Sequence, residues 1–270
     1  MTDSLKDDLI KQVDKILRYH DALGIKEYPR TPDLDNFLAE KTESPPPSFR
    51  PGKEIPAKQD MKRKADGKKH VFDPGLALKA TLADVREEMG DCRRCRLNES
   101  RTNIVFGQGS EKAGLMIIAD GPAREDDQAG SPLQGEPGEL LDKMLQAINL
   151  SRDEIYITTL VKCFPGPDAE PGDNEIRTCL PFLFRQIEII CPKVICTMGV
   201  QASRTLLHSR KSLFQLRGRF YNFNNLCSTK LADEIFIMPT LHPAILLDNP
   251  ELKKASWQDL QMIQKKLRGK

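Results

Sequence analysis

Apolar residues form short runs that alternate with amphipathic stretches from about Leu82 to the C-terminus. Runs of this length predict buried strands, at residues 115–119, 155–160, 193–197 and 235–238. Apolar positions at helical spacing predict helices at residues 139–148, 175–190, 200–207 and 252–267, and a hairpin is expected around residues 219–227. Because strands followed by crossover helices build parallel sheets, the pattern predicts a layered α/β domain with functional loops at the carboxyl ends of its strands.

The first 27 residues carry a separate helical pattern. Between Asp3 and Leu23 the apolar residues recur at helical spacing, namely Leu5, Leu9, Ile10, Val13, Ile16 and Leu17. An amphipathic helix with one apolar stripe needs a surface to cover it. Docking on the main domain and docking on another protein both fit, so a protein partner for this helix stays open.

The composition of residues 28–80 predicts a flexible basic linker. The proline run Pro45–Pro47 is followed, between Arg50 and Lys69, by eight Lys or Arg residues against three acids. Such a stretch lacks the apolar periodicity needed to fold alone. It fits nonspecific contact with phosphates and a merely solvated tether equally well.

Composition describes one full domain, expected at residues 81–270, plus extra segments. The chain has 270 residues, of which 39% are hydrophobic and 30% charged, with a net charge of +2. No membrane span is apparent, and the charged N-terminus lacks the pattern of a secretory signal. We therefore expect a cytoplasmic protein with reduced cysteines. So small a net charge does not by itself indicate nucleic-acid binding.

Four cysteines have the spacing of a metal site. Cys92 and Cys95 form a CxxC pair, and Cys163 and Cys179 follow far downstream. An iron-sulfur cluster is favoured over zinc, because zinc ribbons usually close with a second short CxxC, and inert buried thiols are the third alternative. The remaining thiols lie in or beside apolar runs and are expected to be small buried hydrophobes, namely Cys191, Cys196 and Cys227.

The loops after the predicted strands hold the residues with chemical potential. Asp120-Gly121-Pro122-Ala123 follows the first strand, and His242-Pro243 follows the last. A carboxylate and an imidazole at one sheet edge fit a hydrolytic pocket, with the carboxylate handling water and the imidazole a developing anion. Plain connecting turns are the alternative, because Asp-Gly-Pro and His-Pro turns are common.

Several segments, read in order, resemble a known family. They are Cys92-x-x-Cys95-x-Leu97, Val105-Phe106-Gly107-x-Gly109, Asp120-Gly121-Pro122 with Glu125-Asp126, Gly130-x-Pro132-x-x-Gly135-x-x-Gly138, Tyr156-Ile157-Thr158, Val161-Lys162-Cys163, Glu175-Ile176-x-x-Cys179, Arg217-Gly218 and His242-Pro243-Ala244-x-Leu246-Leu247. Together they resemble the family 4 uracil-DNA glycosylases over about residues 88–265.

The resemblance implies a three-layer α/β/α sandwich of the uracil-DNA glycosylase type with a mainly parallel central sheet. It implies a structural 4Fe-4S cluster held by Cys92, Cys95, Cys163 and Cys179. Enzymes of this family bind uracil-containing DNA, extrude the uracil and hydrolyse its bond to the deoxyribose, which initiates base excision repair. The resemblance assigns water activation to Asp120, stabilisation of the departing anion to His242, and the base pocket to Gly121, Pro122, Leu133 and Thr159.

This chain departs from the family pattern at the pocket. The family's Glu in the first loop is Asp120 here, its stacking aromatic is Leu133, and its uracil-reading Asn is Thr159. Beyond the histidine, the usual Tyr is Ile245 and the usual Arg is Asp248. A shorter acid, a lost π face and a single hydroxyl predict altered efficiency and weaker discrimination between uracil and cytosine.

Two functions therefore compete. In the first, the protein is a glycosylase acting on uracil or another deaminated base in single- or double-stranded DNA. In the second, it is a catalytically weak or inactive paralogue that binds DNA or docks a partner. An electron carrier is a weaker third alternative, because nothing in the sequence supplies a second redox centre. The persistence of an acid and the histidine at their positions favours the enzyme.

Overall fold

The computed structural model describes residues 81–167, 169–225 and 234–269. The predicted N-terminal helix at residues 1–27, the predicted linker at residues 28–80 and Cys227 lie outside the described residues.

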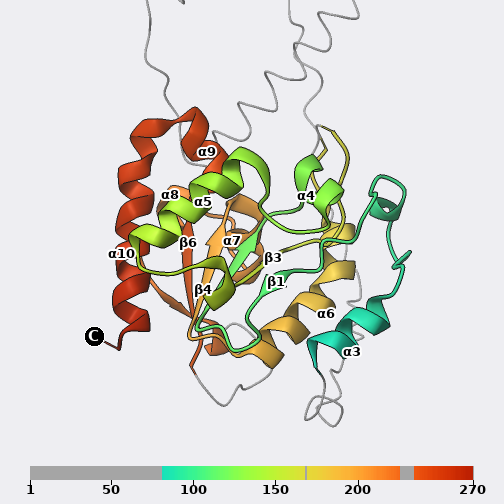
Figure 1. Cartoon of the computed structure of the whole chain (residues 1–270), viewed down its shortest axis with the longest axis horizontal. Helices are drawn as coiled ribbons and strands as arrows, with labels where there is room; N and C mark the ends of the chain where they lie inside the picture. Colours follow the sequence, from blue (N-terminus) through green and yellow to red (C-terminus); the bar gives the residue numbers. More distant parts are fainter. Residues whose placement is uncertain (1–80, 168, 226–233, 270) are drawn as a thin grey trace, which may run out of the picture.

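A six-stranded sheet forms the centre of the described domain, in the order β1-β3-β2-β4-β6-β5 (Figure 1). The strands are β1 (Gln108–Gly109), β2 (Leu115–Ala119), β3 (Tyr156–Thr159), β4 (Val194–Met198), β5 (Tyr221–Asn222) and β6 (Phe236–Thr240). The four inner strands are parallel, and the short edge strands β1 and β5 pair antiparallel. The prediction of a mainly parallel α/β sheet is confirmed.

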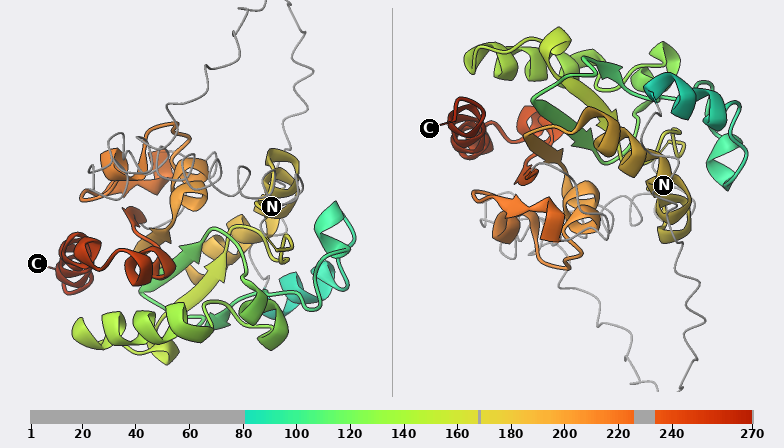
Figure 2. Two further views of the ribbon diagram at one scale, coloured as in Figure 1. Left: turned by 90° about the horizontal axis from the view of Figure 1, so that it is seen from above. Right: turned by 90° about the horizontal axis from the view of Figure 1, so that it is seen from below.

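Helices cover both faces of the sheet, as Figure 2 shows. They are α3 (Leu82–Met89), α4 (Arg124–Ala129), α5 (Gly135–Ala147), α6 (Asp173–Ile190), α7 (Val200–Leu206), α8 (Leu213–Leu216), α9 (Pro243–Asp248) and α10 (Lys253–Leu267). Short 3-10 helices lie at Arg96–Asn98, Arg152–Glu154, Phe223–Asn225 and Pro250–Leu252.

The alternation of side chains along the strands divides the core into two layers. Met116 and Ile118 of β2 belong to the buried cluster that includes apolar residues of α6 and α7. Leu115 and Ile117 belong to the opposite cluster, which includes residues of α5 and α10. Because successive side chains of a strand point to opposite faces, a strand that is buried throughout requires helices on both sides. The expected three-layer α/β/α sandwich is thereby confirmed.

The predicted element boundaries differ from the observed ones in specific ways. The strand at 115–119 is β2 as predicted, whereas α5 begins at Gly135 rather than at residue 139. The sequence analysis did not predict α3, α4, α8 or α9, which have eight, six, four and six residues. Near the predicted hairpin, β5 pairs with β6, and residues 226–233 are not described. Across the described segments, no helix is both long and apolar enough to cross a bilayer.

Candidate active site and cysteine cluster

The carboxyl ends of the inner strands meet at one edge of the sheet. In the strand register, Ala119 of β2 pairs with Thr159 of β3 and with Met198 of β4, and Met198 pairs with Thr240 of β6. Asp120 and His242 follow β2 and β6, the two neighbours of β4. The two candidate catalytic residues therefore leave the same edge, on either side of Gly199.

Backbone amides at the start of α7 hold the Asp120 carboxylate. Its Oδ1 accepts a hydrogen bond from Ala202 N at 2.7 Å, and its Oδ2 accepts one from Val200 N at 3.1 Å. Gly199 has a φ of +121°, and a Cβ at this position would overlap the carboxylate. Burial raises the pKa of Asp120 to about 6, although the amides of α7 act to lower it.

His242 is the N-cap residue of α9. Pro243 occupies the first helical position, and His242 Nδ1 accepts a hydrogen bond from Ala244 N at 3.2 Å. Burial lowers the pKa of His242 to about 4, so the imidazole is neutral at physiological pH. Because Nδ1 accepts, the proton of the neutral ring lies on Nε2, which leaves one N–H donor for a ligand.

The candidate base-pocket residues are placed differently from one another. Thr159 is fully buried, and its hydroxyl donates to Val161 O at 2.6 Å. Leu133 is 3% exposed and belongs to the buried cluster that contains Leu141. Pro122 is buried, whereas Gly121 is partly exposed.

The backbone of Leu133 has a φ of +53°, which is uncommon for a residue other than glycine. Two features hold it there. Arg152 Nη2 donates a hydrogen bond to Leu133 O at 2.7 Å. Gly138 approaches the same carbonyl oxygen so closely that a Cβ at this position would overlap it. The packing of α5 thus fixes the loop that carries Leu133.

The four spaced cysteines come from three segments. Cys92 and Cys95 lie after α3, Cys163 follows β3, and Cys179 lies on α6; all four are free thiols. The pKa of Cys163 is raised to about 11, chiefly by burial; Arg101 acts against this rise, and the neighbouring thiols of Cys179 and Cys95 add to it. The pKa of Cys179 is also raised, first by burial and then by Cys95 and Cys92. The fold therefore brings the four sulfurs into electrostatic range of one another.

These sulfurs do not form a site for one metal ion. In the described part of the chain, no group of three or more His, Cys, Asp or Glu side chains is placed to hold a single ion.

Two arginines lie against the cysteines. Arg101 Nη1 donates to Cys163 Sγ at 3.5 Å and to Cys92 O at 2.8 Å, and Arg94 Nη1 donates to Cys92 Sγ at 3.5 Å. Sequence reasoning missed their roles. The run Cys-Arg-Arg-Cys signalled positive charge near the ligands, but only the fold connects Arg101 with a sulfur 62 residues away.

A buried ion pair supports the strand that leads to His242. Arg217 forms two hydrogen bonds of 3.0 Å to the carboxylate of Asp259 on α10, and Thr240 Oγ1 donates to the same carboxylate at 2.7 Å. Asp259 is 0% exposed. Thr240 ends β6 two residues before His242, so this network fixes the strand end that positions the imidazole.

The fold and this edge define an α/β domain of the glycosylase type, and comparison with known sequences agrees. The sequence model of the Uracil DNA glycosylase superfamily matches residues 106–261. The chain is 37% identical to the type-4 uracil-DNA glycosylase of Sulfurisphaera tokodaii over 192 residues, which cover 68% of this chain and 83% of that protein. It is 35% identical to the type-4 enzyme of Saccharolobus solfataricus, covering 69% and 86%, and 33% identical to that of Thermotoga maritima, covering 66% and 90%.

Both comparisons lead to the same assignment. The chain belongs to the type-4 uracil-DNA glycosylase family.

Proposed function

We propose that this protein hydrolyses the N-glycosidic bond of uracil, or of another deaminated base, in DNA and so initiates base excision repair. The observation that carries the proposal is that the Asp120 carboxylate and the neutral His242 imidazole lie at the same edge of the sheet, directly after β2 and β6, the two neighbours of β4. This pairing supplies a group that can receive a proton from water and an uncharged donor for a departing anion.

The proposed reaction begins with a base extruded from the DNA stack. The bond between the base nitrogen and C1′ of the deoxyribose breaks, and its electron pair leaves with the base. His242 Nε2–H donates a hydrogen bond to the oxygen of the base on which the charge develops. Water adds to C1′ and passes its proton to the Asp120 carboxylate, and the base anion takes a proton from solvent. The products are the free base and an abasic sugar.

Gly121, Pro122, Leu133 and Thr159 are proposed to form the base pocket. Thr159 is the last residue of β3 and pairs with Ala119, which directly precedes Asp120. Thr159 therefore lies at the same edge as Asp120, which supports this assignment. Its hydroxyl already donates to Val161 O, so it can offer the base an accepting lone pair but not a second proton. A site of this kind distinguishes uracil from cytosine less strongly than an asparagine amide, which presents a donor and an acceptor.

Cys92, Cys95, Cys163 and Cys179 are proposed to hold a 4Fe-4S cluster. When bound, the cluster supplies a covalent tie between the loop after α3, the loop after β3 and helix α6. Around it, Arg101 and Arg94 contribute donors to the cysteine sulfurs. An ion pair of 2.6 Å between Arg96 Nε and Glu175 Oε1 joins the CxxC loop to α6 independently of any metal.

The test is an assay with oligonucleotides that contain uracil, hypoxanthine or xanthine, as single strands and as duplexes, followed by alkaline cleavage of abasic sites. Release of any of these bases supports the proposal. Tight binding without release, unchanged by Asp120→Ala, would instead identify a DNA-binding paralogue. The burial of Leu133 and the engagement of Asp120 with α7 are the observations that favour this second function.

The rate of base release should fall at acidic pH because of Asp120, not His242. Burial holds the pKa of Asp120 at about 6 and that of His242 at about 4, so the active combination of carboxylate and neutral imidazole exists above about pH 6. Below that, we expect kcat/KM to decrease about tenfold per pH unit as Asp120 takes a proton. Single-turnover rates between about pH 4 and pH 8 measure this.

Asp120→Asn is the control for the pH profile, since an amide does not titrate. Its residual activity should be flat through the same range. If the rate of this variant fell at acidic pH with the same midpoint as the parent, a group other than Asp120 would control the reaction.

A triple variant, Asp120→Glu with Thr159→Asn and Leu133→Phe, should excise uracil at least about tenfold faster than the parent. A stacking ring alone contributes about 1 to 3 kcal/mol per base, and the amide adds a paired donor and acceptor. The three single variants serve as controls, each with a melting curve, because Leu133 lies in the core and a larger ring there can strain it. A folded triple variant with no gain would contradict the residue assignments of the pocket.

A further inference from the structure

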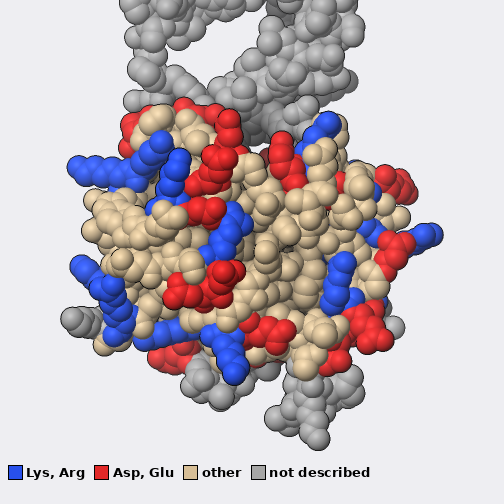
Figure 3. Space-filling model, viewed as in Figure 1, with Lys and Arg blue, Asp and Glu red and all other residues tan. Residues whose placement is uncertain are grey.

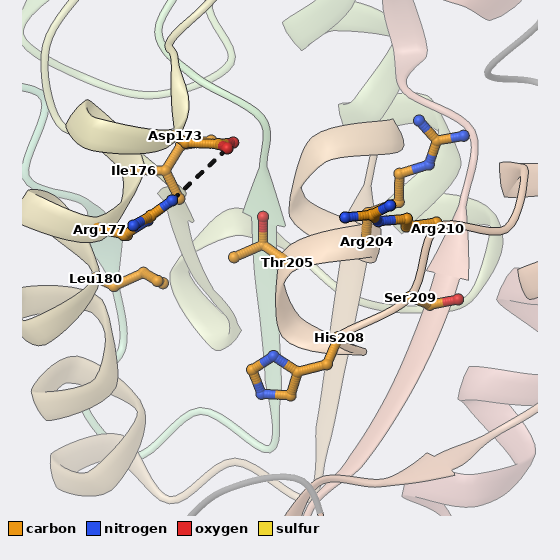
Figure 4. A pocket seen from close by; sticks show the side chains of 9 residues that line it. All are labelled: Asp173, Ile176, Arg177, Leu180, Arg204, Thr205, His208, Ser209 and Arg210. Carbon is orange, nitrogen blue, oxygen red and sulfur yellow. Dashed lines mark ion pairs between the residues drawn. The ribbon is translucent and has the colours of Figure 1, made fainter. Parts of the chain in front are cut away.

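A groove of about 410 Å³ lies between helices α6 and α7, and its lining includes neither Asp120 nor His242 (Figure 4). One wall comes from the first two turns of α6, and the other comes from the end of α7 and the turn after it. The lining residues are Asp173, Ile176, Arg177, Leu180, Arg204, Thr205, His208, Ser209 and Arg210. We call this feature the α6–α7 groove.

The α6–α7 groove is predominantly cationic. It contains the arginines Arg177, Arg204 and Arg210 and one acid, Asp173. Asp173 pairs with Arg177 at 3.7 Å, but both side chains are more than three quarters exposed, at 89% and 77%. Exposed ion pairs of this kind contribute little, so Arg177 can exchange its partner for a ligand at small cost.

The other two arginines keep donors available. Arg204 Nε donates a hydrogen bond to Lys211 O at 2.9 Å, and among the described residues its two terminal nitrogens have no acceptor. Arg210 is exposed, and its side chain has no hydrogen-bond or ion-pair partner within the described ranges. Figure 4 shows Arg204 and Arg210 on the α7 side of the groove and Arg177 on the α6 side. Planar guanidiniums with free donors are the side chains that bind phosphates best.

The groove begins close to the proposed catalytic edge. Helix α7 starts directly after Gly199, and Arg204 lies five residues further on, about 7.5 Å along the helix axis. Near the start of α6, Glu170 accepts a hydrogen bond from Gln201 at 2.9 Å and acts to raise the pKa of Asp120 after the larger effect of burial. Since one strand of DNA carries a phosphate about every 3.4 Å of helix axis, the groove lies two or three nucleotides from the edge.

On the face of the domain drawn in Figure 3, positive and negative side chains are mixed. On the face seen in Figure 3, Lys and Arg side chains alternate with Asp and Glu, so that face offers no continuous cationic surface. The phosphates of a DNA strand are therefore attracted more strongly to the α6–α7 groove than to the face seen in Figure 3.

We propose that the α6–α7 groove binds the phosphodiester backbone of the DNA strand next to the nucleotide under repair. This proposal rests on the proposed function, because it takes the catalytic edge as the point from which the strand continues. Arg204 and Arg210 contact successive phosphates, and Arg177 closes the groove from the α6 side. The apolar side chains of Ile176 and Leu180 accept the sugar. A free nucleotide carries the same phosphate chemistry, and the experiment separates the two sources.

The test measures binding of a uracil-free, fluorescently labelled single strand to the full chain by anisotropy over a range of salt concentrations. For Arg204→Ala/Arg210→Ala we expect about a tenfold loss of affinity at low salt and a decrease of about 1 to 2 in the salt slope. Arg204→Lys/Arg210→Lys keeps the charge and should retain most of the slope. With enzyme in excess, the protein concentration needed for half-maximal base release should rise by about the same factor as the affinity falls, about tenfold.

The matched control removes two cations from the opposite edge of the sheet, as Lys112→Ala/Arg268→Ala. Lys112 precedes β2 and Arg268 follows α10, where Gly114 lies next to Leu267. The proposal is overturned if the groove variant loses no more affinity than this control. It is also overturned if deoxyadenosine monophosphate binds the parent and not the groove variant while strand binding stays equal in both.

Failure of the groove and failure of the proposed function give different results. Loss of strand binding in the arginine variant of a protein that releases no base supports the groove and contradicts the enzyme. Normal base release with unchanged strand binding contradicts the groove alone.

Discussion

Replacing His242 with alanine should lower the single-turnover rate of base release by about 10²- to 10³-fold, the effect typical of removing one preorganised donor to a developing anion. The donor is preorganised because Ala244 N occupies Nδ1 and burial keeps the ring neutral. A neutral donor gains strength as charge develops on the leaving base, whereas the ground state gains little. The measurement is the rate of abasic-site formation with enzyme in excess.

A second variant separates chemistry from helix capping. His242→Ala also removes the N-cap of α9, which costs about 0.5 to 2 kcal/mol of stability. His242→Asn restores a capping side chain but not an imidazole, so it should melt near the parent and remain slow. An asparagine variant as fast as the parent would contradict the role given to the imidazole.

Replacing Cys163 with serine should remove most of the iron and lower the melting temperature by about 10 °C or more, equivalent to about 3 kcal/mol or more. In the proposed cluster, Cys163 ties the loop after β3 to Cys179 on α6 and to the CxxC loop, so the loss of this ligand weakens the connection among three segments. The parent should purify brown with about four iron atoms per chain, and the variant nearly colourless. Iron and sulfide analysis and thermal melting measure both effects.

Cys191→Ser is the control for this experiment. Cys191 is half-buried and caps the C-terminal end of α6, and the proposal gives it no ligand role. Its serine variant should keep the iron of the parent. If Cys163→Ser also kept its iron and melted like the parent, Cys163 would not be a ligand.

Much of the fold follows from the sequence, because buried parallel strands have a strong local signal. β2 and β4 consist entirely of buried residues, and an uninterrupted apolar run marks such strands. Short helices lack a comparable signal. α4 has the sequence Arg-Glu-Asp-Asp-Gln-Ala and no apolar face, and its polar residues are explained only by their contacts. Asp126 and Asp127 accept backbone hydrogen bonds from Gln134 N and Thr102 N, respectively, which no periodicity predicts.

The sequence predicts which loops meet at one edge of the sheet, but not the contacts made there. Loops after parallel strands meet at one edge, so Asp120 and His242 could be expected to lie near each other. The hydrogen bonds from α7 to Asp120 join residues 80 and 82 positions apart, and local sequence contains no trace of them. These bonds give the carboxylate of Asp120 a defined position at the start of α7.

The pocket substitutions agree with this arrangement in part. Asp120 is held by α7, and Leu133 fills space in the core, so both have structural contacts that a longer acid and an aromatic ring would have to change. Ile245 on α9 packs against the buried cluster of Val200, Leu213, Leu241 and Leu246. Nothing in the structure explains Asp248, where the resemblance gives an arginine.

The most direct test of the central claim is mass spectrometry of a single-stranded oligonucleotide with one uracil, before and after incubation with excess protein. If Asp120 and His242 hydrolyse the glycosidic bond, the strand should lose the mass of uracil and gain that of water, and free uracil should appear in equal amount. The same measurement is made with strands that contain hypoxanthine or xanthine. If the masses of all three strands stay unchanged, the account is contradicted.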